Sequence, residues 1–274
     1  MRRFATFTAV LSLVIATLSV TPAVFGFSIE EVVTGVASVV PGEPAVPTTP
    51  AADHLPDNDH ARGVVFNGLR PAGPNGPCAG GFEMTVDGQT LCTPGPDRGP
   101  EGHDVRRSRS IPSAQANDTA TDGVATALAT STFPVVGDGA SGNRVVAVYA
   151  VATDRADRYA DVAPMISEWA ANVDTMMNQS AALTGGERHV RFVTDAAGAL
   201  AVEKVIMPAD GDDSFGATIS ALKAAGYNDP SRKYLIWTDA NLYCGIATIY
   251  SDDKPTQDNY NNGRFAQYAR VDAG

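Results

Sequence analysis

The chain has few of the residues from which catalytic metal sites and covalent catalysis are built. Its 274 residues include three cysteines and four histidines, and no histidine is followed by glutamate. The zinc-binding motif H-E-x-x-H is therefore absent from this sequence. A Gly-rich phosphate loop and a G-x-S-x-G nucleophile elbow are also absent. Ser141 lies in GDGASGN, which does not match the nucleophile-elbow motif. No complete catalytic set of residues can be assembled.

Basic residues are also scarce. Lysine and arginine number 20 against 31 aspartates and glutamates, which gives a formal net charge of -11 and a pI near 4.7. Nucleic acids and anionic membrane surfaces attract proteins through clustered positive charge. This composition argues against both as partners.

Long apolar runs are absent except at the start of the chain. A basic Met-Arg-Arg is followed by an apolar run at 4–20 and by small residues up to Ala23 and Gly26. The pattern predicts a secretory signal peptide at 1–26, with an uncleaved anchor as the alternative. We expect a secreted, extracellular protein with no membrane attachment after cleavage, in which disulfides are permitted.

Two of the three cysteines lie close together in the sequence, and the third is distant from them. Cys78 and Cys92 flank two short strand-like runs around Asp87-Gly88, a dipeptide typical of hairpin turns. We predict a disulfide-stapled hairpin at 78–92. Cys244 is left over, which indicates a free thiol, a partner chain or a missing partner.

The chain changes character near residue 135. Residues 27–134 form a Pro/Gly-rich region that we expect to be extended and mobile outside the hairpin, since 12 of the 18 prolines lie between Pro41 and Pro112. Residues 135–274 show periodic apolar patterns and predict one α/β domain.

The expected fold of 135–274 is α/β (α+β), with a mixed, mostly parallel sheet and two main helices. The apolar run at 145–151 is typical of a strand buried on both faces. The two helices are expected at 161–182 and at 213–226, the second capped by Asp213 or Ser214. The remaining strands are expected at 189–195, 200–207, 233–239, 244–250 and 268–271.

Two polar clusters invite a metal interpretation, and for each a plainer one is favoured. His54 and His60 lie among aspartates, but a hydrophilic linker explains them without a fixed ligand geometry. Asp210, Asp212 and Asp213 lack the glycine and distal glutamate of a calcium loop. Helix capping explains that cluster better.

Several motifs together resemble a group of secreted actinobacterial zincin-like proteins, related in layout to the metzincin metallopeptidases. They are GDGASGNRVVAVYAV, DRYADVAPMISEWAANVD, RHVRFVTDA, KYLIWTDANLYCGIATIYSDD and DNYNNG…YARVDAG, with CAGGFE…LCTPGPD nearer the N-terminus. The resemblance covers residues 63–274. It implies a zincin-like N-terminal subdomain whose sheet precedes a helix bearing H-E-x-x-H.

No position here matches that family's zinc ligands or general base, so no catalytic or metal residue is assigned. The resemblance implies a C-terminally truncated domain, zinc only in a full-length relative, and a partner for Cys244 beyond Gly274. It also implies an edge strand that pairs with an extended peptide or protein, with a plain structural edge strand as the alternative. The residues of this predicted strand are Gly245, Ile246, Ala247, Thr248, Ile249 and Tyr250.

The preferred functional hypothesis is an exported zincin-like metallopeptidase homologue that is inactive as given because the zinc helix is missing. The alternative is a secreted non-catalytic binding module with a complete α/β domain. A third possibility is a fragment with a marginal fold and an exposed strand, which predicts aggregation.

Overall fold

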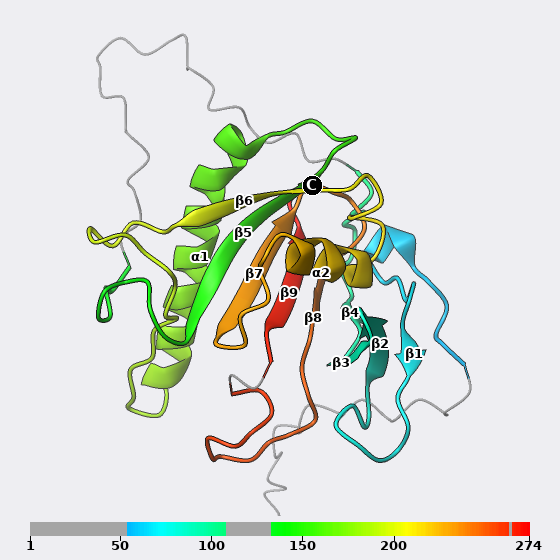
Figure 1. Cartoon of the computed structure of the whole chain (residues 1–274), viewed down its shortest axis with the longest axis horizontal. Coiled ribbons are helices and arrows are strands. Elements are labelled where there is room, and N and C mark those ends of the chain that lie inside the picture. Colours follow the sequence, from blue (N-terminus) through cyan, green and yellow to red (C-terminus); the bar gives the residue numbers. More distant parts are fainter. Residues whose placement is uncertain (1–53, 108–132, 263–264) are drawn as a thin grey trace, which may run out of the picture. The chain divides into compact units, whose positions relative to one another are not determined.

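A six-stranded mixed sheet is the centre of the computed structural model, which describes residues 54–107, 133–262 and 265–274 (Figure 1). The predicted signal peptide and much of the predicted linker lie outside these residues. The order of the strands is β4-β8-β9-β7-β5-β6. The strands are β4 (Pro96–Asp97), β5 (Arg144–Ala152), β6 (Val202–Met207), β7 (Arg232–Thr238), β8 (Gly245–Ala247) and β9 (Gln267–Asp272).

The sheet is mostly parallel, as predicted. β6, β5, β7 and β9 run parallel, whereas β8 is antiparallel to β9 and β4 is antiparallel to β8. Strand β5, which lies between β7 and β6, is almost entirely buried, which explains why its sequence is apolar without alternation.

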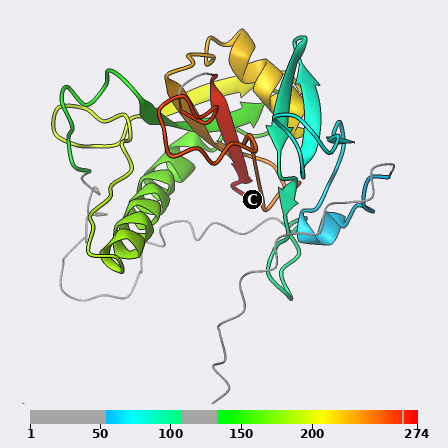
Figure 2. The ribbon, with the colours of Figure 1, turned by 90° about the horizontal axis from the view of Figure 1, so that it is seen from below.

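Two helices lie on opposite faces of this sheet (Figure 2). Helix α1 (Tyr159–Ala182) buries Val162 and Ile166, and its Pro164 is the sixth helical residue, so the missing N–H removes one intrahelical hydrogen bond. Helix α2 (Phe215–Ala224) begins after Ser214, whose side chain accepts a hydrogen bond from the Ala217 N–H. Both helices match the prediction. No helix among the described residues is long and apolar enough to cross a membrane.

The predicted hairpin is also confirmed. β2 (Phe82–Val86) and β3 (Gln89–Thr93) pair through a turn in which Asp87 and Gly88 have φ values of 49° and 75°. This left-handed backbone is what a two-residue hairpin turn requires. β1 (Arg70–Pro71) adds a third strand, a short 3₁₀ helix η1 (His60–Arg62) precedes it, and Cys78 and Cys92 form the expected disulfide.

The described residues on either side of the hairpin, within 54–107, are not the loose linker that their composition predicts. Phe66, Met84 and Leu91 are buried in one apolar cluster with Ile219 of α2 and Ile236 of β7. Residues 54–107 therefore share a core with the sheet, and no boundary near residue 134 separates two cores. Local proline and glycine content does not reveal this burial, because the contacts are with residues far away in the sequence.

Two predicted strands differ from the structure. Residues 189–195 form only isolated bridges at Phe192 and Thr194, because the Val190 N–H donates to the Asp174 carboxylate of α1 instead of to a strand. The strand expected at 244–250 is shorter, with β8 ending at Ala247.

Candidate functional site

Helix α1 covers only part of its face of the sheet. It packs on β5 and β6, and none of the helices in the described ranges lies over β7 and β9 on that side (Figure 2). Leu235, Ala247, Ala269 and Val271 are only partly buried there. We call these four residues the open face.

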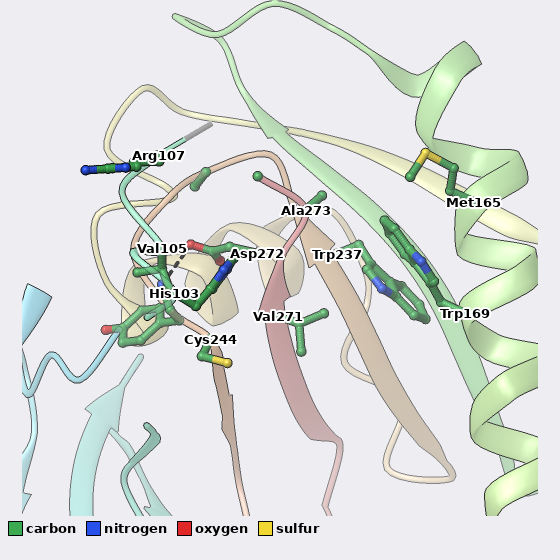
Figure 3. Close-up of a pocket in the computed structure, with 13 residues that line it drawn as sticks. His103, Val105, Arg107, Met165, Trp169, Trp237, Cys244, Val271, Asp272 and Ala273 are labelled. Atoms are coloured by element: carbon green, nitrogen blue, oxygen red, sulfur yellow. Dashed lines mark hydrogen bonds between the residues drawn. The ribbon is translucent and has the colours of Figure 1, made fainter. Parts of the chain in front are cut away.

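A cavity of about 430 Å³ lies beside the open face at the carboxyl end of the sheet (Figure 3). Met165 and Trp169 of α1 and Trp237 of β7 line one side, and Figure 3 shows the two indole rings side by side. Their ring centroids are 6.5 Å apart and their planes differ by 24°. His103 and Cys244 line the other side. Aromatic walls with a few polar groups at the rim are typical of a surface that receives another apolar element.

A second, smaller hollow continues the apolar character of the same face. It has a volume of about 240 Å³ and is lined by Val173 of α1 together with Leu235, Ala247 and Ala269. Val173 is 38% exposed although it lies on the side of α1 that faces this hollow. The apolar surface therefore extends along β7 and β9 and is not confined to one pocket.

A buried ion pair supports the carboxyl end of β9. The Arg270 Nε lies 2.8 Å from the Asp272 carboxylate, and the two side chains are 0% and 4% exposed. The same carboxylate accepts the backbone N–H groups of Leu242 and Tyr243. The pair thus ties the loop after β7 to β9, next to the cavity.

A second polar network lies at the carboxyl ends of β5 and β7. The Tyr149 hydroxyl donates to the Asp239 carboxylate at 2.7 Å and accepts the Arg158 N–H at 2.9 Å. The Arg158 guanidinium also pairs with Asp239 and donates to the Gly274 carbonyl. Burial, together with the hydrogen bond to Asp239, raises the pKa of Tyr149, so this phenol is a fixed donor and not a proton carrier.

The predicted peptide-binding strand does not have the free edge that was expected for it. Ile246 and Gly245 pair with Pro96 and Asp97 of β4, so β8 lies between two strands. The Ile249 N–H donates to the Cys92 carbonyl. The expectation of an open edge is wrong, because residues assigned to a linker fold back along this strand. Peptide binding by residues 245–250 stays a prediction.

Cys244 is a free thiol with intermediate exposure. A free thiol was one of the three alternatives that the odd number of cysteines left open. The backbone of Cys244 packs closely against Gly63, in the turn after η1. A Cβ on Gly63, whose φ is 70°, would come within 2.5 Å of the Cys244 backbone nitrogen. Only glycine fits this turn without displacing the loop that carries the thiol.

The described residues contain no group of three or more histidine, cysteine, aspartate or glutamate side chains arranged to hold a metal ion. Asp212 is buried and pairs with Arg155, which agrees with a structural role for the aspartate cluster. His189 lies between the carboxylates of Asp174 and Glu187, and the hydrogen bonds to them raise its pKa.

The polar networks and the tryptophan-lined cavity were not predicted from the sequence. A signal for the networks exists, because Asp239 and Asp272 each end a run that predicts a strand. The carboxyl ends of parallel strands meet at one edge of a sheet, which brings such residues together. Comparisons of the chain with protein-family models, with curated proteins and with solved structures find no match.

Proposed function

We propose that this chain is the non-catalytic N-terminal part of an exported zincin-like metallopeptidase. In this proposal the chain supplies the sheet, and its open face is the surface on which a zinc-bearing helix packs. The 274 residues do not encode that helix. When bound to such a helix, zinc would activate a water molecule for peptide hydrolysis. The residues that the structure describes do not fit a zinc site by themselves, so no catalytic step is assigned to them.

The observation that carries the proposal is the open face beside α1. The six residues of β9 span about 20 Å at roughly 3.3 Å per residue. A helix of about 13 residues has the same length. An amphipathic helix laid along β9 would cover Leu235 and Val271 and would contact the ring of Trp169.

The polar networks have a positioning role in this proposal. The Arg270–Asp272 pair holds the loop after β7 against β9, and the Tyr149–Asp239–Arg158 network holds the start of α1. Both lie at the carboxyl edge of the sheet, beside the cavity that the helix would adjoin. The two networks would keep the open face and the start of α1 rigid, and would take no part in peptide hydrolysis.

The first experiment uses the purified chain. We expect no tightly bound zinc by elemental analysis and no casein hydrolysis after zinc is added. One zinc per chain with chelator-sensitive hydrolysis would refute the proposal.

The second experiment sequences the transcript beyond codon 274. An open frame that encodes a helix with H-E-x-x-H supports the proposal, and the extended protein is then expected to bind one zinc. Leu235→Lys is expected to weaken zinc binding in the extended protein by placing a charge on the open face. Ile206→Lys is the matched control, because Ile206 is already 54% exposed on β6. A stop codon there, with cooperative folding of the chain, favours the secreted binding module instead.

A further inference from the structure

We propose that the segment from Pro77 to Asp97 is a built-in cover of β8 and of the residues that follow it. The cover occupies the hydrogen-bonding edge that another extended peptide would need, and the Cys78–Cys92 disulfide holds it in place. This inference does not depend on whether the protein belongs to a peptidase.

The first part of the cover is β4. Pro96 is opposite Ile246 and Asp97 is opposite Gly245, in antiparallel register. Gly245 is buried under this contact, and a Cβ there would lie 2.9 Å from the Asp97 Oδ2. The amino-terminal half of the predicted peptide-binding strand is therefore already paired.

The second part of the cover lies along the residues after β8. The Ile249 N–H donates to the Cys92 carbonyl at 2.9 Å, and the Ser251 N–H donates to the Pro77 carbonyl at 2.8 Å. The Ser251 hydroxyl donates to the Ala79 carbonyl at 2.6 Å. The two N–H donors are alternate residues, and their acceptors lie in the two segments that the Cys78–Cys92 disulfide joins.

The disulfide joins the two chain segments that make these bonds. Cys78 lies between Pro77 and Ala79, and the carbonyl of Cys92 is itself an acceptor. Both sulfur-bearing residues are buried, at 4% and 1% exposure, against Tyr250. Without the bridge, residues 77–79 would depend on their own few hydrogen bonds to stay in place.

The outer side of the cover is unsuited to further pairing. Pro94, Pro96 and Pro100 lie in or beside β4 and have no N–H to donate. Prolines of this kind are a recognised means of closing a sheet edge. The cover therefore blocks β8 without presenting a new edge.

The cover can open without unfolding the core. The hairpin is anchored separately, because Met84, Val86 and Leu91 are buried in the cluster that contains α2. Residues 77–79 and 92–97 lie on either side of these anchors in the sequence. Movement of these two stretches breaks the end pairs of the hairpin, Cys92 with Glu83 and Thr93 with Phe82, and would expose the backbone of residues 249–251 while the rest of the hairpin stays on α2.

The test is amide hydrogen exchange followed by NMR, in the wild-type chain and in the double variant Cys78→Ser/Cys92→Ser. We expect exchange at Ile249 and Ser251 to accelerate at least ~100-fold in the variant, because local opening replaces opening of the whole fold. Amides of β5 and β7 report opening of the whole fold, so they should accelerate only by the loss of global stability, and the acceleration at Ile249 and Ser251 is measured relative to them. Cys244→Ser is the control, since it removes a thiol and leaves the cover intact.

A second measurement uses a synthetic peptide with the sequence of residues 90–99 and serine in place of Cys92. The variant is expected to bind this peptide and the wild-type chain is not. Equal exchange at Ile249 and Ser251 in the two proteins would overturn the role of the disulfide. Equal peptide binding by both proteins, or by neither, would overturn the cover.

If the double variant unfolds, β5 and β7 lose their protection as well. Native-state exchange of the wild-type chain in low urea then decides the matter. The Ile249 and Ser251 amides are expected to open at a lower urea concentration than those of β5. Opening in step with β5 would show that the cover is inseparable from the core and would overturn the proposal.

Discussion

Replacement of Asp272 by alanine is expected to be among the most destabilising single changes in this protein. The change leaves the Arg270 guanidinium buried at 0% exposure without its counter-charge. Among the described residues, the Thr218 hydroxyl, at 2.8 Å, and the Ser214 carbonyl, at 3.3 Å, would still accept hydrogen bonds from it. The N–H groups of two loop residues would lose their acceptor at the same time.

The magnitude follows from the burial of the pair. Removal of one partner from a buried ion pair costs about 3–5 kcal/mol of unfolding free energy, because the remaining charge is uncompensated. The double variant Arg270→Met/Asp272→Ala removes that charge as well. It is expected to recover at least ~1 kcal/mol relative to Asp272→Ala alone, because no uncompensated charge is then left buried.

Urea unfolding followed by far-UV circular dichroism measures these differences. With the m-values usual for domains, the midpoint for Asp272→Ala should fall by about 1–2 M. Asp258→Asn is the matched control: Asp258 pairs with Lys254 at the surface with 72% of its side chain exposed, and no midpoint shift is expected. A loss below ~1 kcal/mol for Asp272→Ala, or a double variant no more stable than the single one, would refute the reasoning.

Three further changes have defined outcomes. The His189 pKa is raised above its ordinary 6.5 by two carboxylates, so its contribution to stability is complete below that value and is lost as the pH rises through the raised value. The difference in urea midpoint between wild type and His189→Gln should therefore shrink as the pH rises above about 6.5. Cys78→Ser/Cys92→Ser should lose about 3 kcal/mol, because the bridge closes a short loop of sequence separation 14. Tyr149→Phe should lose about 1–3 kcal/mol in the same urea assay, because the buried Asp239 carboxylate loses a donor.

Each of these expectations has a result that contradicts it. A wild-type to His189→Gln difference that grows with pH would mean that the neutral ring is the stabilising form. An unchanged urea midpoint in the Cys78→Ser/Cys92→Ser variant would mean that the disulfide does not contribute to the stability of the fold. For tyrosine, Tyr159→Phe is a useful comparison, since that hydroxyl donates to a backbone carbonyl and not to a carboxylate. Equal losses for the two tyrosine variants would argue against a special role for Asp239.

Much of the α/β domain could be predicted from the sequence. The 3.6-residue pattern of α1, the Ser214 cap of α2 and the apolar run of β5 are local signals, and each corresponds to an observed element. The turn Asp87-Gly88 is equally local, and it placed the hairpin and its disulfide correctly.

Features that depend on distant contacts could not be predicted in the same way. Residues 54–107 look like a linker by composition, yet Phe66 is 7% exposed because it packs in the core shared with α2. The pairing of β4 with β8 joins positions about 150 residues apart. Sequence patterns predict that a strand exists, whereas the identity of its second neighbour is decided by tertiary packing.

The arrangement of the two indole rings has a practical consequence. Trp169 and Trp237 are the only tryptophans in the chain, and both line the cavity beside the open face. The tryptophan fluorescence of the protein therefore originates at this one place. Any helix, peptide or small molecule that settles there will displace water from the Trp169 ring and shift the emission to shorter wavelength. The protein thus carries its own optical reporter for the arrival of whatever covers its sheet.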